Sequence, residues 1–393
     1  MDQHILQTYQ ESSNLVFDVI KQTFPFLSEG DFLSFEEKYT QYYDNLSQIG
    51  NDRDFFINLR KFVVSIRNSH TRLSNIPNQK IFMPNGYNVI IINNRFYLQD
   101  QTKIIGEIIS IDSRKFQDIL REKIDLTSGS TKQFITKQAL KNIFVREKTT
   151  DIKLVLKSNG RIIKKTLSCR TYIFKEPKQA IDTHVLGNNS DYIKIPTWID
   201  EHISEKKLID KLRETMIKDA QLLIIDVRGN SGGNSNIARS FASHFFNEKV
   251  LFNTAEQRAS KDNFKLMKKK NFVDPTKPYY DIPIIILIDS LCFSSNEYFI
   301  AGMKDNKRAI LIGETTGGGS GNPRKLEIPF RDSSFSLFVS TWNYYRPNGE
   351  LLEGNGIKPD IVVRPTLDGL KKGRDEVLEK AIEEANKLLN INI

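Results

Sequence analysis

The chain has 393 residues, of which 39% are hydrophobic and 27% are charged, and its formal net charge is +9. A chain of this length is long for a single core, so we expect two or three domains of an ordinary soluble protein. The basic residues are spread along the sequence, and the longest cluster, Lys268 to Lys270, stands in a loop-like stretch without interleaved aromatic residues. This pattern favours a solvated basic surface over a nucleic-acid interface.

The two cysteines, Cys169 and Cys292, are too few for a disulfide framework and form no CxxC pattern, although one disulfide between them is left open. The N-terminus lacks the basic region and apolar core of a signal peptide, and no apolar run approaches the roughly 20 residues of a membrane span. We therefore expect no metal, no organic cofactor, no nucleic-acid partner and no membrane span. The location is expected to be the cytoplasm, or the outside of the cell as the mature form of a secreted protein.

The first 75 residues are expected to form a small helical bundle. Apolar residues recur at helical spacing from about Glu11 to Arg67. Pro25 and two glycine-containing pairs divide this segment into about three helices. The helical pattern ends at the sequence NSHTRLSN, residues 68–75.

Residues 76–180 are expected to form a compact mixed β domain, because the hydrophobic period changes to two and β-branched residues become frequent. The Asn159-Gly160 pair between two apolar runs predicts a tight hairpin. The expected strands span 87–92, 95–98, 104–111 and 152–156, and the expected helices span 116–124 and 137–143.

Strands and helices alternate in the remaining segment, residues 181–393, which is typical of an α/β fold with helices packed on a sheet. The expected strands span 192–195, 222–226, 284–288 and 309–312, with further strand material in 325–343. The expected helices span 203–218, 237–246, 297–303 and 375–389.

One buried strand of this segment, in LLIIDVRGNSGGN, ends in a glycine-rich turn before a helix. Gly229, Gly232 and Gly233 suit a plain strand-to-helix turn, but glycines at a helix start also leave backbone N–H groups free to face an oxyanion. No Gly-Lys-Ser/Thr follows, which excludes a Walker phosphate loop, and the dinucleotide fingerprint is absent. The residues alone leave a structural turn and an anion-binding turn open.

A second buried strand, Ile284 to Ile288, is followed by small and polar residues and then by a helix from about Glu297. This layout presents a serine hydroxyl to solvent and to nearby backbone N–H groups, and such a hydroxyl needs a base to become a nucleophile. Among the five histidines, His70 is the candidate base because it stands in a loop, next to hydroxyl residues that can orient it. The others stand at the N-terminus or in polar or helical contexts without a motif.

Three segments together resemble peptidase family S41, which includes the C-terminal processing peptidases, the tricorn core and the interphotoreceptor retinoid-binding protein modules. They are DVRGNSGG (226–233), SSNEYFIAGMKDNKRAILIGETTGG (294–318), and GNGIKPDIVV followed by TLDGLKKGRDEVLEKAI (354–382), in the family's order. The sequence HTRL at His70 is similar to an element of the histidine-using branch. The resemblance implies an α/β fold: a ClpP/crotonase-like catalytic core (181–393) with an N-terminal helical bundle (1–75) and a PDZ-like mixed β domain (76–180).

The resemblance also implies a nucleophile and an oxyanion hole. The family's nucleophile lies three positions before the glutamate that enters the helix, which is Glu297 here, so the nucleophile is Ser294. Ser295 is its nearest competitor. The implied oxyanion donors are the backbone N–H of Ser295 and one from the glycine turn, either Gly232 or Gly233.

The base separates two branches of the family. The processing-peptidase branch uses a Ser/Lys dyad, but the matching position in this chain is Gly319, and no lysine follows it before Lys325. A Ser/Lys dyad is therefore not expected.

The tricorn-like branch instead uses a serine, a histidine, the serine before that histidine and a glutamate. The adjacent Ser69 and His70 match the pair, and Glu353 is the closest candidate for the glutamate, with Glu350 as the alternative. In this set His70 takes the proton of Ser294, while Ser69 and Glu353 hold the imidazole in the right tautomer.

The leading hypothesis is a serine endopeptidase that acts on peptides or unfolded protein segments. The PDZ-like domain is expected either to grip a substrate by edge addition or to cap the site, since it lacks a clear carboxylate-binding glycine loop. One alternative is a non-catalytic binder of apolar ligands, like the retinoid-binding modules, and another is a crotonase-like acyl-CoA enzyme. The serine turn and the Ser-His pair argue against both, and the oligomeric state is left open.

Overall fold

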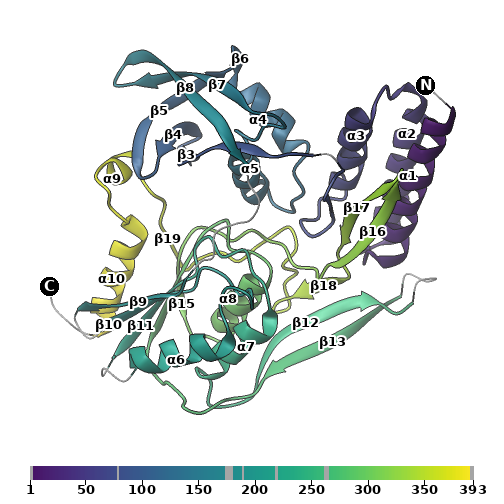
Figure 1. Ribbon diagram of the computed structural model, residues 1–393. Helices are drawn as coiled ribbons and strands as arrows, with labels where there is room; N and C mark the ends of the chain where they lie inside the picture. The colour runs from purple at the N-terminus through teal and green to yellow at the C-terminus, as the bar shows by residue number, and fades with distance from the viewer. Residues whose placement is uncertain are drawn as a thin grey trace.

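The computed structural model describes residues 3–389 apart from residues 78, 173–179, 188–189, 217–219 and 261–264. Figure 1 shows an N-terminal group of helices and a β-rich unit, both above an α/β core that contains the last helix of the chain.

The N-terminal helices pack around an aromatic core. Their bounds are α1 Gln3–Thr23, α2 Glu29–Asp44, the short 3-10 helix η1 Leu46–Gln48, and α3 Asp52–Val64. The side chains of Ser28 and Asn51 cap α2 and α3 by accepting backbone N–H groups. Acidic residues follow each cap, which suits the positive end of the helix dipole.

This helical core is completed from the other end of the sequence. A small sheet of β1 (Arg72–Ser74), β17 (Ser333–Val339) and β16 (Arg324–Phe330) lies against the helices, and Leu73, Phe335 and Leu337 are part of the same buried cluster. Strand β1 therefore ties the end of the bundle, next to His70, to the C-terminal half of the chain.

The mixed β unit is one antiparallel sheet with two helices. Asn159 and Gly160 have φ values of 48° and 78° at the turn between two long paired strands, so the predicted hairpin is confirmed. The strand order is β2 (Phe82–Pro84), β8 (Arg161–Tyr172), β7 (Thr150–Ser158), β5 (Lys103–Ile111), β4 (Arg95–Asp100) and β3 (Tyr87–Ile92), with β6 (Arg114–Lys115) beside β5. The helices are α4 (Phe116–Ile124) and α5 (Lys132–Lys141).

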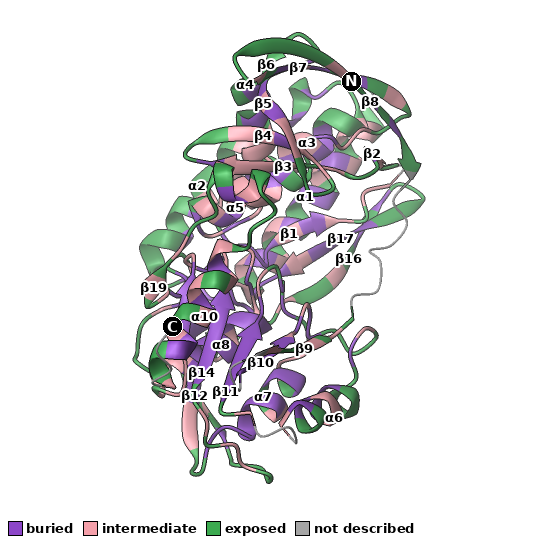
Figure 2. Ribbon diagram, turned by 90° about the vertical axis from the view of Figure 1, so that its left-hand side faces the viewer, coloured by how far each residue is buried: buried purple, intermediate pink, exposed green. Residues whose placement is uncertain are grey.

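The α/β core is built on a six-stranded sheet that is parallel except at one edge. Its order is β19 (Ile361–Val362), β15 (Ile310–Gly313), β14 (Ile284–Ile288), β11 (Leu222–Asp226), β10 (Ser190–Lys194) and β9 (Asp182–Gly187), and β9 runs antiparallel to β10. Every residue of β11 and β14 is buried, as Figure 2 shows, because both faces of a parallel sheet are covered.

Helices cover the two faces of this sheet. One face packs against α6 (Glu205–Met216), α7 (Ser235–Ser243) and α8 (Ser295–Asp305), and the other packs against α10 (Glu376–Leu388). The short helix α9 (Leu367–Lys371) precedes α10. In the described part of the chain, no helix has both the length and the apolar character that crossing a membrane requires.

A fourth sheet corrects one expectation from the sequence. Strands β13 (Leu266–Val273), β12 (Val250–Arg258) and β18 (Trp342–Tyr345) form an antiparallel sheet, and Lys268 to Lys270 lie in β13 rather than in a loop. The lysine run is polar and shows no strand pattern of its own, but it forms a strand because it pairs with β12. The amine of Lys268 lies 3.5 Å from the carboxylate of Glu256.

One arginine joins the C-terminal helix to the core by pairing with two carboxylates. Arg228, just after β11, donates to Asp226 at 2.9 and 2.7 Å and to Asp375, the N-cap of α10, at 2.8 and 2.7 Å. Asp226 is fully buried, and the hydroxyl of Tyr192 also donates to it, at 2.7 Å.

Replacing Arg228 by alanine is expected to destabilise the protein by about 3–5 kcal/mol, because it leaves the charge of Asp226 buried without its main partner. Chemical denaturation measures the loss. The matched control is Arg374→Ala, which breaks an exposed ion pair with Glu379 and should cost less than about 1 kcal/mol. Equal losses in the two variants would contradict the structural role of Arg228.

Candidate active site

Ser294 stands at the junction between β14 and α8 in a strained backbone conformation. It precedes the first residue of α8 with φ 59° and ψ −126°, a left-handed region that costs a non-glycine residue about 1–3 kcal/mol. The N–H of Ser294 donates to the carbonyl of Gly319 at 3.1 Å, and the N–H of Phe293 donates to the carbonyl of Asn230 at 3.1 Å. These bonds tie the strained turn to both glycine-rich segments and hold the serine in place.

His70 lies beside this serine although the two residues are far apart in the sequence. The Nε2 atom of His70 is 3.0 Å from the Oγ atom of Ser294. The side chain of Asn68 accepts the backbone N–H groups of His70 and Thr71 at 3.0 and 2.9 Å, which fixes the loop. The imidazole stacks on the ring of Phe293 at 4.6 Å and 18°. The hydrogen bonds from the loop to Asn68 and the stacking on Phe293 therefore fix the imidazole next to the hydroxyl of Ser294.

The environment keeps His70 uncharged. Its side chain is 4% exposed, and burial, followed by the charge of Arg72, lowers the pKa of His70 to about 3. At neutral pH a bare ring nitrogen is thus available to accept a proton from Ser294.

Ser69 lies next to His70 in the chain, but its hydroxyl bonds elsewhere. The Oγ atom of Ser69 is 2.8 Å from the Oγ atom of Ser130, and the N–H of Ser69 also donates to Ser130, at 3.1 Å. Within the described residues, the buried Nδ1 atom of His70 has no hydrogen-bond partner. The expected direct bond between Ser69 and the imidazole is therefore not formed in this conformation.

The carboxylate of Glu353 is hydrogen-bonded to the same serine, Ser130. Its Oε1 atom accepts the hydroxyl of Ser130, and its Oε2 atom accepts the N–H of Ser320 at 2.9 Å. Burial raises the pKa of Glu353 to about 8, and the bonds from Ser130 and Ser320 only partly oppose this. The alternative, Glu350, is 65% exposed and pairs with Arg346 at 2.6 Å. Of the two carboxylates, only Glu353 is hydrogen-bonded to the residues around His70.

The glycine turn lies directly against the nucleophile. A Cβ atom on Gly232 would lie 2.8 Å from the Cβ of Ser294 and 2.9 Å from the backbone nitrogen of Ser295, so only glycine allows this approach. The N–H of Gly232 donates to the side chain of Asn230 at 2.8 Å and is already paired. Among the described residues, the N–H groups of Gly233 and Ser295 have no protein acceptor. Of the proposed oxyanion donors, these two remain free.

Glu297 organises the other glycine-rich loop, a role that the sequence analysis did not assign to it. This fully buried carboxylate accepts the N–H groups of Gly318 and Gly319 at 2.8 and 2.9 Å and the hydroxyl of Thr316. Burial raises the pKa of Glu297 to about 7. The sequence carried a signal for this residue, since Glu297 is part of the motif that locates Ser294.

The packing around Gly319 leaves no room for a lysine side chain at this position of the loop. A Cβ atom on Gly319 would lie 2.1 Å from the ring of Phe293 and 3.0 Å from the Oγ of Ser69. A side chain at position 319 would therefore displace the ring on which His70 stacks. Lys325 bonds to Glu327 at 2.8 Å on β16 and is half-exposed.

The mixed β unit contributes residues that the sequence analysis missed. Thr131 caps α5 and donates its hydroxyl to the carbonyl of Gly317 at 2.6 Å, and Gln133 donates to the carbonyl of Thr316 at 3.1 Å. The ring of Phe134 stacks on Phe293 at 4.5 Å. In the sequence these residues show only a helix-capping signal, because their partners lie about 160 to 190 residues away.

The cysteines and the acidic groups supply no further site. Cys169 and Cys292 are both buried and free, so the disulfide left open by the sequence is not formed. Within the ranges that the structure describes, no cluster of three or more His, Cys, Asp or Glu side chains is arranged to hold a metal ion.

The sequence matches the model of Peptidase family S41 over residues 190–363. A curated relative, the carboxy-terminal-processing protease of Bartonella bacilliformis, is 29% identical over 279 residues, which cover 70% of this chain and 58% of that protein. The chain thus spans less than two thirds of the length of this relative.

Solved structures show the same fold. Mature CPAF complexed with lactacystin has a TM-score of 0.83 at 14% identity, with 99% of this chain and 100% of that chain covered. The tricorn protease has a TM-score of 0.54 at 14% identity, with 98% of this chain and 37% of that chain covered. The predicted fold class, an α/β protein with a ClpP/crotonase-like core, a helical N-terminal part and a PDZ-like mixed β unit, is confirmed. The family match over residues 190–363 and the shared fold together show that this chain is similar to the peptidases of family S41.

Proposed function

We propose that this protein is a serine endopeptidase that hydrolyses peptide bonds in peptides or unfolded protein segments. The observation that carries the proposal is the 3.0 Å contact between the Nε2 atom of His70 and the Oγ atom of Ser294. A buried, uncharged imidazole in contact with a serine on a strained turn is the arrangement of an activated nucleophile.

In the proposed reaction, His70 takes the proton of Ser294 as the serine oxygen attacks the carbonyl carbon of the scissile bond. The N–H groups of Gly233 and Ser295 donate to the oxygen that becomes negative. Removing one such donor from an oxyanion hole typically costs about 2.7–4 kcal/mol of barrier lowering. His70 then gives the proton to the leaving amine, and water hydrolyses the acyl-enzyme in the same way.

The low pKa of His70 sets a requirement on the rest of the site. Burial that lowers this pKa also disfavours the imidazolium that forms during the reaction. A nearby negative charge offsets that cost, and Glu353 is linked through Ser130 to Ser69, the neighbour of His70 in the sequence. We therefore propose that Glu353, in its ionised form, supports the cation.

The mixed β unit fits the role of a cap over this site. Thr131, Gln133 and Phe134 all bind the glycine-rich loop or the ring beneath His70. These contacts support the cap interpretation rather than the capture of a substrate C-terminus.

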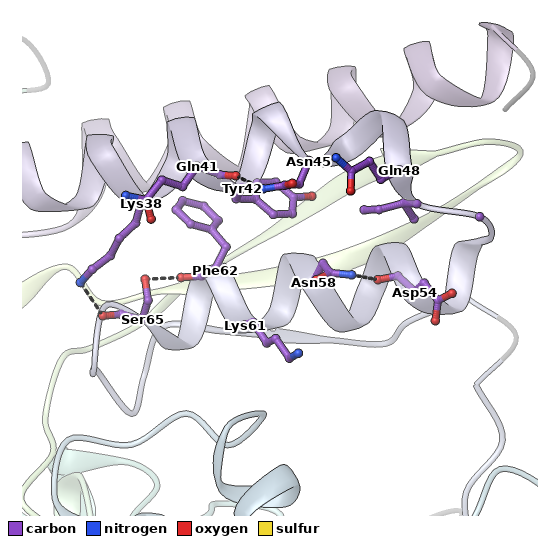
Figure 3. Close-up of a pocket in the computed structure, with 12 residues that line it drawn as sticks. Lys38, Gln41, Tyr42, Asn45, Gln48, Asp54, Asn58, Lys61, Phe62 and Ser65 are labelled. Carbon is purple, nitrogen blue, oxygen red and sulfur yellow. Dashed lines mark hydrogen bonds between the residues drawn. The ribbon is translucent and has the colours of Figure 1, made fainter.

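The alternative of an apolar-ligand carrier is not favoured. The hollow in Figure 3, of about 560 Å³, lies between α2 and α3, in the helical bundle. Its lining is rich in amide and charged groups, among them Lys38, Gln41, Asn45, Asn58 and Lys61. Such a lining does not suit an apolar ligand.

The test is covalent labelling with a fluorophosphonate probe, together with a casein cleavage assay. We expect the wild type to cleave casein and to carry the label on Ser294, as located by mass spectrometry, and Ser294→Ala to lose both. The control is Ser334→Ala, which removes an exposed hydroxyl on β17 and should leave both unchanged. A folded wild type that neither reacts with the probe nor cleaves casein would contradict the proposed function.

A further inference from the structure

A serine from the mixed β unit sits inside the candidate active site. We propose that Ser130 is a positioning residue that connects Glu353 to Ser69 and thereby sets the tautomer and orientation of His70. The proposal rests on the proposed function for its catalytic consequence, but its structural part concerns only the hydrogen-bond chain.

The geometry places Ser130 between the two other residues. Its Oγ atom is 2.8 Å from the Oγ of Ser69, accepts the N–H of Ser69 at 3.1 Å, and donates to the Oε1 of Glu353. No direct hydrogen bond joins the side chains of Ser69 and Glu353 among the described contacts, so Ser130 is the side-chain link between them.

The number of hydrogens that each group can donate determines which residue donates and which accepts in this hydrogen-bond chain. An ionised carboxylate only accepts, and a hydroxyl has one hydrogen to donate. Ser130 therefore donates its hydrogen to Glu353 and accepts those of Ser69. The hydroxyl of Ser69, having donated, offers only lone pairs to any further partner.

His70 follows Ser69 in the sequence and has a buried Nδ1 atom without a partner, which we take as the next member of the hydrogen-bond chain. Lone pairs on Ser69 favour the tautomer that carries its hydrogen on Nδ1. That tautomer leaves Nε2 bare and facing Ser294, which is the state that a general base needs. The bond from Nδ1 to Ser69 is absent in this conformation and is expected to form as the imidazole gains its charge.

The position of Ser130 is fixed by the docking of α5. The next residue, Thr131, is bonded to Gly317, and Phe134 stacks on Phe293, so the loop that carries Ser130 is held on the glycine-rich loop. In Figure 1, α5 lies between the mixed β sheet and the α/β core. The cap therefore supplies a part of the hydrogen-bond chain that neither the helical bundle nor the core contains.

Two other charged groups affect the ionisation of the residues in this hydrogen-bond chain. The carboxylate of Glu297 opposes the ionisation of Glu353, and the guanidinium of Arg72 opposes the protonation of His70. Neither donates to nor accepts from Ser130, so replacing Ser130 leaves their contacts intact.

The experiment compares Ser130→Ala and Ser130→Thr with the wild type in a peptide hydrolysis assay over a range of pH. Losing a hydrogen bond to a charged group is expected to lower kcat about ten- to a hundredfold, while KM changes by less than about threefold. Because the bond from Ser130 favours the carboxylate form of Glu353, the acidic limb of the pH profile should move to higher pH. Ser130→Thr keeps the hydroxyl and should recover most of the activity.

The matched control is Thr136→Ala on α5, the helix that follows Ser130, since among the described residues the hydroxyl of Thr136 bonds to the carbonyl of Lys132 alone, at 2.8 Å. It should match the wild type in kcat and in pH profile. Should Ser130→Ala not fold, Ser130→Cys, which keeps the size but donates weakly, takes its place.

A second readout does not depend on catalysis. The ¹⁵N chemical shifts of His70 report its tautomer, and Ser130→Ala should reduce the population with hydrogen on Nδ1. An inactive wild type whose tautomer still responds to Ser130→Ala would support the positioning role and contradict the proposed function. An active wild type that Ser130→Ala leaves unchanged in kcat, pH profile and tautomer would overturn the inference.

Discussion

Replacing His70 by alanine is expected to lower kcat/KM for peptide hydrolysis by about 10⁴- to 10⁶-fold, the order of the losses found when single members of the catalytic triad of a serine peptidase are removed. The reason is that no other described side chain that can act as a base contacts the hydroxyl of Ser294. Steady-state kinetics on a fluorogenic peptide, with active protein counted by probe labelling of the wild type, gives the ratio.

The pH profile adds a second expectation for the same residue. The pKa of His70 is lowered to about 3, so its imidazole is uncharged throughout the neutral range. Protonation of His70 should then not produce an acidic limb near pH 6.5, the ordinary pKa of histidine. An acidic limb near neutral pH must come from another group.

The matched control for the base is Lys325→Ala. Lys325 is the first lysine after the position where a Ser/Lys dyad would place one, and its amine pairs with Glu327 on β16. We expect kcat/KM within about twofold of the wild type, as for a surface ion pair of small energy. If Lys325→Ala abolished hydrolysis while His70→Ala did not, the assignment of the base would be wrong.

The sequence predicts those elements whose pattern is local. Strands Tyr87–Ile92, Leu222–Asp226 and Ile284–Ile288 and helix Phe116–Ile124 have the same bounds in the structure as in the sequence analysis. Each is a continuous apolar run or a regular repeat between clear turn signals, so its own residues determine it. The Asn159-Gly160 hairpin belongs to the same class, because its turn chemistry is contained in two residues.

Elements that depend on distant partners were missed or misread. The run Lys268–Lys270 has no apolar alternation, yet it is a strand because β12 supplies its hydrogen bonds. The helical bundle similarly depends on Phe335 and Leu337, whose strand lies more than 250 residues beyond the last helix of the bundle. The domain boundaries at residues 75 and 180 stay predictions, and this shared core shows that the bundle does not bury its apolar surface alone.

The residues of the candidate site likewise fall into those that a local motif predicts and those that only distant contacts reveal. Ser294 and His70 could be proposed because each lies in a motif, and the structure places their side chains in contact. Ser130 could not, since its partners Ser69 and Glu353 stand 61 and 223 residues away and the local sequence shows only a helix start. Asn230 could not be predicted either. It lies inside the glycine turn, but only the structure shows that its side chain accepts a hydrogen bond from the N–H of Gly232.

Replacing Glu353 by glutamine is expected to lower kcat/KM about 10²- to 10⁴-fold above pH 8, the upper figure being the effect of a wrong imidazole tautomer in a serine peptidase. A glutamine amide donates to Ser130 where the carboxylate accepts. Ser130 then donates to Ser69, and Ser69 donates to the Nδ1 atom of His70. The ring hydrogen is forced onto Nε2, the atom that must accept the proton of Ser294.

The wild-type pH profile follows from the same carboxylate. Burial raises the pKa of Glu353 to about 8, so the ionised form that supports the imidazolium is present only above that pH. The kcat/KM of the wild type should therefore rise with pH through about 8. In Glu353→Gln this limb should disappear, and a limb that persists unchanged would show that another group titrates.

The same substitution should increase stability at high pH. A carboxyl whose pKa is raised by folding contributes stability that is fully present below about pH 4.5 and is lost as the pH rises through about 8. Glutamine cannot ionise, so Glu353→Gln should be more stable than the wild type at pH 9. We expect a gain of about 1–3 kcal/mol, less than the full pKa shift implies, because part of the Glu353 side chain is in contact with solvent.

The control is Glu350→Gln, which changes an exposed carboxylate paired with Arg346 and should alter neither activity nor stability by much. The informative result is the combination of effects at position 353. A carboxylate kept only for structure would lose stability when replaced, whereas one kept for catalysis at an energetic cost loses activity and gains stability. Chemical denaturation and kinetics at pH 9 on the same three proteins therefore decide between a structural and a catalytic role for Glu353.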